Sequence, residues 1–177
     1  MQRVGTERIA LGLLLLGLGL VWGCEQGGSS GSNLLAPGSA PPTIMAEGWV
    51  DGPPLAWEQL AGKVAVVDIW AYWCGPCRAA APGLVQTYDR YRAQGVVFLG
   101  LTSEGRNKLD EIRGFIRDAG IRWPTAYGAD ATISSFGVRF LPTVIVIGRD
   151  GRVFWNSELG GTLDEAIRGA LAQGRSA

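Results

Sequence analysis

The stretch WAYWCGPCRAAAPG, residues 70–83, most constrains what this chain can fold into. It completes the run VAVVDIWAYW, whose β-branched and aromatic residues predict a strand that is buried on both faces. After Cys74 and Cys77 the chain is Ala-rich, with apolar residues at helical spacing, which predicts a helix that ends at Gly95. Pro82 lies inside that helix and is expected to kink it. The sequence therefore predicts a buried strand that leads into a C-x-x-C pair at the start of a helix.

Metal binding and a purely structural disulfide both fit this cysteine pair poorly. The chain has 3 cysteines and no histidine, so it lacks the four Cys or His ligands of an ordinary structural zinc site. A copper carrier would need further soft ligands, and Met45 is the only methionine after the first residue. A disulfide that closes so short a loop restricts the unfolded chain very little. We therefore expect no metal and no cofactor at Cys74 and Cys77.

A redox-active dithiol makes use of the residues around the pair. Cys74 would lie at the N-terminus of the predicted helix, where free backbone amides and the helix dipole favour a thiolate. A thiolate can attack a disulfide, and Cys77, one helical turn later, can attack the resulting mixed disulfide and release the product. Pro76 would stiffen the turn between them. The pattern predicts thiol–disulfide exchange with Cys74 as the nucleophile and Cys77 as the resolving cysteine.

The rest of the chain supplies the elements of a single α/β domain. VVFLGLT predicts a second buried strand, and NKLDEIRGFIRDAG predicts an amphipathic helix. TVIVIGRDGRVFWNS predicts a β-hairpin that turns near Asp150 and Gly151. TLDEAIRGALAQG predicts a final helix with Thr162 as its N-cap and Glu165 completing a capping box. The order β-α-β-α-β-β-α predicts a central mixed β-sheet flanked by helices.

The first 24 residues, MQRVGTERIALGLLLLGLGLVWGC, resemble an export signal. Positive residues precede an apolar run at residues 9–21, which is shorter than the ~20 residues that a membrane-spanning helix needs. We therefore expect residues 1–23 to be a signal peptide. The ending LVWGC resembles a bacterial lipoprotein processing site, which would make Cys24 a lipidation site that anchors the protein to a membrane. The alternative is an ordinary signal peptide, or an uncleaved anchor in which Cys24 is incidental.

Residues 24–42 are rich in Gly, Ser and Pro and show no apolar period. Such a segment buries too little apolar surface to offset its ordering entropy, so we expect a flexible tether. The folded domain is then expected at residues 43–177. The formal net charge of zero gives no electrostatic reason to expect a nucleic-acid partner, and we expect none.

The segment VVDIWAYWCGPCRAAAP resembles the active-site segment of thioredoxins. The lead-in GPPLAWEQLAGKVAVVDIW and the second half, GIRWPTAYGADATISSFGVRFLPTVIVIGRDGRV, resemble the TlpA/ResA-like branch, the membrane-tethered bacterial thiol-disulfide oxidoreductases. The resemblance covers residues 47–171 and includes RWPTAYGAD, residues 122–130, a segment that this branch carries and minimal thioredoxins lack. It implies a thioredoxin-like fold with the cysteine pair as its redox-active disulfide.

The resemblance also implies roles for residues outside the pair. Pro142 matches the family's cis-proline, whose loop, with Leu141 and Thr143 beside it, faces the dithiol and offers backbone groups to an extended client peptide. A trans proline at the start of a strand is the alternative. Trp73 matches the aromatic wall beside the nucleophile, whereas core packing is the expected role of Trp70.

Asp68 matches the buried carboxylate that thioredoxins use to move a proton to or from the second cysteine. Burial in the predicted strand should raise the pKa of Asp68 toward neutral, which suits such a role. The alternative is an aspartate that only makes hydrogen bonds within the core.

These features predict an exported thiol-disulfide oxidoreductase that reduces protein disulfides through a mixed-disulfide intermediate. The Gly-Pro dipeptide between the cysteines is typical of the reducing members of the family. The cell envelope is usually oxidising, so the expected partners are disulfide-bearing clients and a membrane electron carrier that re-reduces the dithiol. By resemblance, candidate clients are apocytochrome c and copper-site assembly factors. The expected location is the cell envelope, with a lipid anchor and the domain facing the periplasm or extracytoplasmic space.

Two other functions remain open at this point. A thioredoxin-fold domain could bind a partner through the Pro142 loop and use its cysteines only as a slow redox sensor. A thiol peroxidase shares the fold but places its cysteine in a Pro-x-x-x-Thr/Ser-x-x-Cys setting. The residues before Cys74 are WAYW, which does not match that setting.

Overall fold

The computed structural model describes residues 34–173, so the expected signal peptide, Cys24 and residues 25–33 lie outside the described residues. Within residues 34–173 the chain forms six strands, four α-helices and three 3₁₀ helices. In chain order these are β1 Gly48–Val50, η1 Trp57–Leu60, β2 Ala65–Ile69, α1 Gly75–Tyr91, η2 Arg92–Gln94, β3 Val97–Leu101, η3 Arg106–Lys108, α2 Leu109–Ala119, β4 Thr125–Tyr127, α3 Asp130–Ser135, β5 Thr143–Ile147, β6 Val153–Asn156 and α4 Leu163–Ala172.

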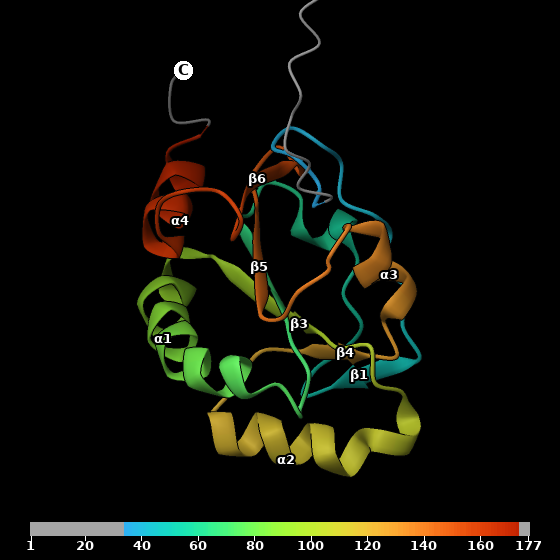
Figure 1. The fold of residues 1–177 in the computed structure, drawn as a ribbon. Helices are drawn as coiled ribbons and strands as arrows, with labels where there is room; N and C mark the ends of the chain where they lie inside the picture. The colour runs from blue at the N-terminus through green and yellow to red at the C-terminus, as the bar shows by residue number, and fades with distance from the viewer. Residues whose placement is uncertain (1–33, 174–177) are drawn as a thin grey trace, which may run out of the picture. The chain divides into compact units, whose positions relative to one another are not determined.

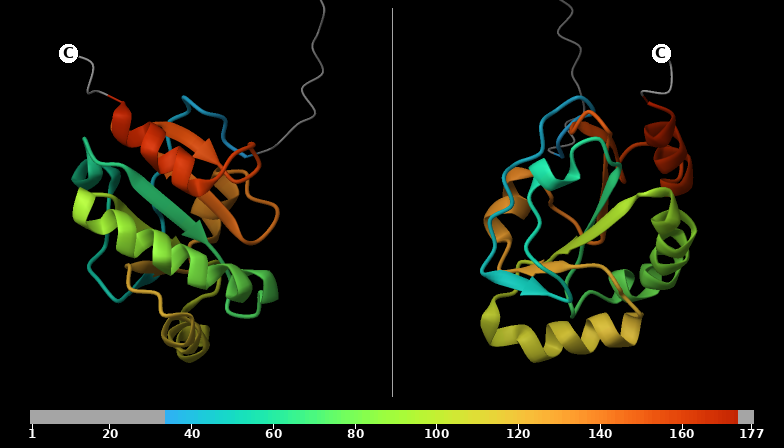
Figure 2. Two further views of the ribbon diagram at one scale, coloured as in Figure 1. Left: turned by 90° about the vertical axis from the view of Figure 1, so that its left-hand side faces the viewer. Right: turned by 180° about the vertical axis from the view of Figure 1, so that it is seen from behind.

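The six strands form one mixed sheet in the order β1-β4-β3-β2-β5-β6. Strand β2 pairs in parallel with β3, and β3 in parallel with β4, while the other neighbouring pairs are antiparallel. Helices α1 and α4 cover one face of the sheet and α3 covers the other (Figures 1 and 2). The predicted mixed sheet flanked by helices is confirmed.

Strand β2 lies at the centre of the sheet, and all five of its residues are buried. Its side chains alternate between the two faces, as the pleat requires. Val66, and Trp70 just beyond the strand, pack in the cluster that includes residues of α1, α2 and α4. Val67 and Ile69 pack in the cluster on the opposite face, which includes residues of α3 and η1. The prediction of a strand buried on both faces is confirmed.

The β5–β6 hairpin and the start of α4 also agree with the sequence pattern. Gly148 and Arg152 close the hairpin between β5 and β6 with a 2.8 Å backbone hydrogen bond, and Gly151 takes a positive φ of 74° in the turn. At α4 the Thr162 Oγ1 accepts from the Glu165 backbone N–H at 3.2 Å, and the Glu165 carboxylate accepts from the Thr162 N–H at 2.8 Å. The predicted hairpin and capping box are both present.

Strands β1 and β4 and helix α3 were not predicted from the sequence. The two strands contain three residues each, which is too short for an alternating pattern to appear. Helix α3 has the sequence DATISS, whose Thr, Ile and Ser residues have weak helix propensity. The first predicted helix also ends earlier than Gly95: α1 stops at Tyr91, and the short 3₁₀ helix η2 leads to Gly95, which has a φ of 81°.

Residues 34–42, the last part of the expected tether, pack against the domain. Leu34 is buried, and the Leu35 N–H donates to the Phe136 carbonyl at 2.9 Å. Two backbone hydrogen bonds then link this segment to the edge strand β6. The Gly38 N–H donates to the Val153 carbonyl at 2.8 Å, and the Val153 N–H donates to the Ser39 carbonyl at 2.9 Å. The apolar side chain of Leu34 and the unpaired backbone of an edge strand supply the stabilisation that the Gly/Ser/Pro composition did not suggest.

Within residues 34–173, no helix is long and apolar enough to cross a membrane.

Candidate active site

Cys74 and Cys77 form a disulfide at the start of α1, with their Cα atoms 5.2 Å apart. Cys74 is the N-cap residue of α1, and its Sγ accepts from the Cys77 backbone N–H at 3.1 Å. Pro76 occupies the first turn, where a missing N–H leaves no helical hydrogen bond unmade. The nucleophile predicted from the sequence therefore lies at the positive end of the α1 dipole.

Asp68 lies in β2 and is buried, with only 2% of its surface exposed. By the alternation of the strand it shares the face of Val66 and Trp70, which pack in the same cluster as both cysteines. Burial raises the pKa of Asp68 from its ordinary value of 3.8 to about 7, as the sequence led us to expect. A group with this pKa can accept or release a proton at neutral pH.

The Trp123 indole is the polar neighbour of this carboxyl. Its N–H favours the ionised form of Asp68 and so lowers the pKa of Asp68, against the larger effect of burial. The buried Trp123 Nε1 has no hydrogen-bond partner among the described residues. Trp123 and Asp68 are therefore neighbours that do not reach full hydrogen-bond geometry. The sequence had suggested no role for Trp123, and no local pattern in RWPT indicates its contact with a strand more than fifty residues earlier.

Gly100 makes room beside Asp68 for the side chains of Thr125 and Trp70. It pairs with Asp68 in the parallel ladder between β2 and β3. A Cβ atom at Gly100 would lie 2.5 Å from Thr125 Oγ1 and 3.1 Å from Trp70 Nε1. The Trp70 ring is itself fixed by stacking on Phe115 of α2, with ring centroids 4.4 Å apart. Trp70 is thus a core residue, as expected, and it packs the space next to the carboxyl.

The Leu141–Pro142 peptide bond is cis, as the resemblance implies. It immediately precedes β5, and Thr143 at the start of β5 pairs with Ile69 at the end of β2. The loop of Pro142 and the loop that carries Cys74 therefore leave the sheet at the same end. Leu141 packs against the cluster that contains both cysteines, and Thr143 Oγ1 donates to the Phe140 carbonyl at 2.7 Å.

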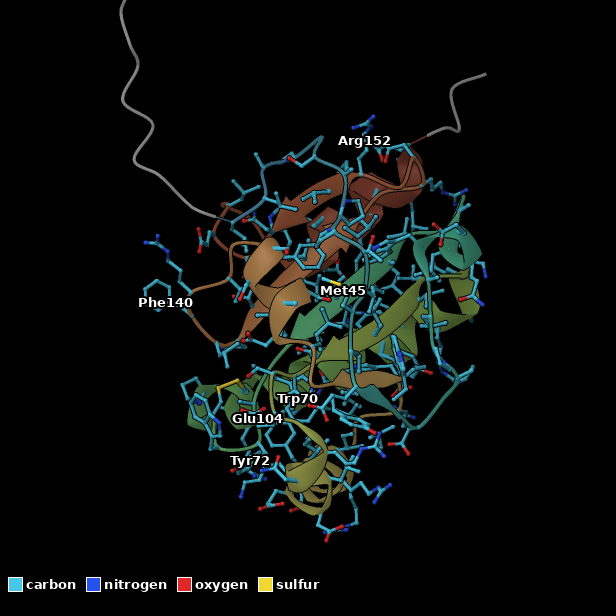
Figure 3. All side chains as sticks on the ribbon, turned by 90° about the vertical axis from the view of Figure 1, so that its right-hand side faces the viewer. Met45, Trp70, Tyr72, Glu104, Phe140 and Arg152 are labelled. Atoms are coloured by element: carbon cyan, nitrogen blue, oxygen red, sulfur yellow. A yellow bond between two sulfur atoms is a disulfide. The ribbon has the colours of Figure 1, made fainter. Side chains whose placement is uncertain are left out.

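Two aromatic side chains at this end of the domain are exposed to solvent. Trp73, next to Cys74, is 65% exposed, and Phe140, two residues before Pro142, is 75% exposed. Figure 3 shows Phe140 projecting from the surface, away from the rest of the domain. Single exposed hydrophobic residues are common, but these two lie in the two loops that leave the sheet at the same end. Sequence reasoning had identified Trp73 and had missed Phe140.

Glu104 was also missed. It lies in the loop between β3 and η3, and its Oε1 accepts from the Trp73 indole N–H at 2.8 Å. Its second carboxylate oxygen accepts from the Thr102 hydroxyl. The only feature of the sequence that points to it is its position just after a buried strand, where functional side chains of α/β folds often lie.

Among residues 34–173, no group of three or more Cys, Asp or Glu side chains could hold a metal ion.

Comparison with known proteins places this site in a family. Residues 36–166 match the Redoxin family. The chain is 28% identical over 105 residues to the thiol-disulfide oxidoreductase ResA of Bacillus thuringiensis, and this match spans 59% of the chain and 60% of that relative. It is 25% identical over 139 residues to ResA of Bacillus subtilis, spanning 78% of the chain and 75% of the relative.

The solved structures agree with these sequence matches. A thiol:disulfide interchange protein of the thioredoxin family from Chlorobium tepidum superposes with a TM-score of 0.63 at 25% identity. The superposition covers 75% of this chain and 97% of that one. The predicted thioredoxin-like fold is confirmed.

Proposed function

Because the chain belongs to the Redoxin family, in its TlpA/ResA-like branch of thiol-disulfide oxidoreductases, we propose that it is an exported enzyme that reduces disulfide bonds in client proteins. The observation that carries this proposal is the Cys74–Cys77 disulfide at the N-terminus of α1. Asp68, with a pKa of about 7, and the cis-Pro142 loop at the same end of the sheet support it.

The catalytic cycle starts from the reduced dithiol. The Cys74 thiolate attacks one sulfur of the client disulfide, and a mixed disulfide forms as one client thiolate leaves. Cys77 then loses its proton and attacks Cys74 Sγ, which forms the Cys74–Cys77 disulfide and releases the second client thiolate. The dithiol loses two electrons and the client disulfide gains them.

Asp68 is proposed to receive the Cys77 proton in the second step. A carboxyl with a pKa of about 7 is partly ionised at neutral pH and can act as a general base. The alternation of β2 supports this role, because it puts Asp68 on the sheet face whose apolar cluster includes Cys77 and other residues of α1.

Around the dithiol, Trp73 and the loop of Leu141, Pro142 and Thr143 are proposed to bind the client. The exposed Trp73 ring offers apolar contact beside Cys74. The loop at Pro142 offers backbone groups to an extended client segment, in the way that main-chain pairing holds peptides in other proteins.

The oxidised product must be reduced again before the next cycle. Two electrons have to come from another dithiol, and in an oxidising envelope a membrane electron carrier is the proposed source. Residues 1–23 as a signal peptide and Cys24 as a lipid anchor would place the domain at the periplasmic face of a membrane. Apocytochrome c and copper-site assembly factors are the client classes that the family resemblance favours.

Covalent trapping separates catalysis from simple binding. In the Cys77→Ser variant the mixed disulfide on Cys74 cannot resolve, so clients should accumulate as adducts that are sensitive to reductant. The Cys74→Ser variant is the matched control and should trap none. Partner binding that survives both substitutions without any covalent adduct would instead identify a binding or sensing module.

The direction of electron transfer is tested by the reduction potential of the Cys74–Cys77 pair, titrated against a dithiothreitol or glutathione buffer. A reductase should lie near thioredoxin, at about −270 mV, and far from the oxidant DsbA, at about −120 mV. A value near the DsbA end would reverse the proposed direction.

A further inference from the structure

The exposed Trp73 side chain is tied to a distant carboxylate. Its indole N–H donates to Glu104 Oε1 at 2.8 Å, across 31 residues of sequence. Trp73 precedes α1, whereas Glu104 follows β3, so the bond joins two separate loops. Figure 3 shows Glu104 in the same region of the domain as the disulfide.

This bond is not needed to satisfy the indole N–H. The Trp73 side chain is 65% exposed, and water could accept from an N–H at the surface. A hydrogen bond that merely replaces one to water contributes little net stability, so its main consequence here is geometric. A charge-assisted bond restricts the torsions of the ring and selects one orientation beside Cys74.

Glu104 is itself held firmly enough to act as an anchor. Its other carboxylate oxygen accepts from the hydroxyl of Thr102, which is fully buried. The Glu104 carbonyl accepts from the Gly128 N–H at 2.8 Å, and the Thr102 carbonyl accepts from the Ala129 N–H at 3.0 Å. The carboxylate is therefore fixed through its side chain and its backbone before Trp73 meets it.

We propose that Glu104 is a positioning residue that holds the Trp73 indole as a preformed wall for the client next to Cys74. This inference rests on the proposed function, because the wall matters only if Cys74 reacts with a protein client. A ring that is already ordered loses less side-chain entropy when the client binds, so the effect belongs to client affinity and not to the chemistry at sulfur.

The first test compares Glu104→Ala with Glu104→Gln in the full chain. Insulin serves as the protein disulfide and 5,5′-dithiobis(2-nitrobenzoic acid) as a small one. Loss of the carboxylate should raise KM for insulin roughly three- to tenfold, with kcat and the rate with the small disulfide nearly unchanged. Glutamine keeps an oxygen that can accept from Trp73, so Glu104→Gln should stay close to the wild type. An unchanged KM in Glu104→Ala, or equal defects in the two variants, would overturn the proposal.

The second test asks whether Glu104 acts through Trp73. The Trp73→Phe variant keeps an aromatic ring but has no N–H to donate. If the bond carries the effect, Glu104→Ala should change KM for insulin in the wild type and hardly at all in the Trp73→Phe background. An equal effect in both backgrounds would show that Glu104 acts through its loop, and the positioning role would be abandoned.

A third readout does not depend on redox activity. The indole ¹H–¹⁵N resonance of Trp73, assigned by its loss in Trp73→Phe, should move upfield in Glu104→Ala and keep its position in Glu104→Gln. An unresponsive resonance would refute the positioning contact while leaving the proposed function intact. If the resonance moves in Glu104→Ala but the wild-type protein does not reduce insulin, the contact exists and the proposed function is refuted. The client-binding role of the wall is then refuted with it.

Discussion

Asp68 joins the stability of the protein to its proposed chemistry. The side chain is buried in the central strand, and this burial raises the pKa of Asp68 to about 7. The same burial penalises the ionised form in the folded state, because a charge is poorly solvated there. The group that makes proton transfer possible at neutral pH therefore also destabilises the fold at that pH.

The stability of the oxidised protein should reflect this pKa. The folded pKa of Asp68 lies above the ordinary 3.8, so the folded state holds the proton more tightly than the unfolded state. The contribution of Asp68 to the stability of the folded protein is fully present below about pH 4. It is lost as the pH rises to about 7 and stays lost at higher pH. The stability of the Asp68→Asn variant relative to the wild type should therefore increase by about 3 kcal/mol from pH 5 to pH 8. Urea unfolding of both proteins at pH 5 and pH 8 measures the difference between their free energies of unfolding. The same difference at both pH values would contradict this prediction.

Turnover should respond to the same substitution in the opposite sense. Without a group that can take the Cys77 proton, Asp68→Asn should slow insulin reduction at pH 7 by up to roughly 100-fold. The pH–rate profile of the wild type should rise through pH 7, and this rise should be missing in the variant. An identical profile in both proteins would leave Asp68 as a core residue only.

Among the elements, β3 shows how a single glycine allows three segments to meet. Gly100 of β3 lies beside Asp68 of β2, and the open space above it holds Thr125 of β4 and the ring of Trp70. The ring in turn stacks on Phe115 of α2. Helix α2 is therefore connected to the surroundings of the carboxyl through packing and not through a charge.

A methyl group at Gly100 should disturb this arrangement. The new Cβ would lie 2.5 Å from Thr125 Oγ1, so Gly100→Ala should destabilise the fold by about 1–3 kcal/mol. Gly83→Ala in α1 is the matched control, because no described atom outside the helix backbone lies within 4 Å of the place that its Cβ would take. Alanine there should stabilise the helix by up to ~1 kcal/mol. Denaturant midpoints of the two variants should move in opposite directions; a shared direction would mean that the space above Gly100 is not tightly packed.

For the whole domain, the segment at residues 34–42 completes the fold at its β6 edge. Leu34 adds to the apolar cluster under α3, and Asn156 of β6, itself buried, donates to the Leu35 carbonyl at 3.1 Å. Trp57 Nε1 donates to the Pro42 carbonyl at 2.7 Å, which fixes the other end of the segment. The folded unit therefore begins before the boundary that composition suggested.

Removal of this segment should weaken the domain. A fragment of residues 43–177 should be less stable than one of residues 34–177 by roughly 2 kcal/mol, the contribution expected from burying one leucine. Leu34→Ala in the longer fragment should reproduce a large part of that loss. Thermal and urea unfolding measure both, and equal stability of the two fragments would show that the contacts at β6 contribute nothing net.

The amino-acid sequence by itself determined the strand that leads into the C-x-x-C pair, the helix behind it, the hairpin and the capping box at Thr162. Each depends on residues close together in the chain, so periodicity, turn residues and caps suffice to predict it. It also indicated that Asp68 is buried, because the residues on both sides of it in the predicted strand are apolar and expected in the core. Only the tertiary structure decided which groups meet there: Trp123 beside Asp68, and Glu104 bonded to Trp73 across 31 residues. The pattern of a segment shows which side chains are buried, but not which distant side chains they meet, because that depends on how the strands and helices pack.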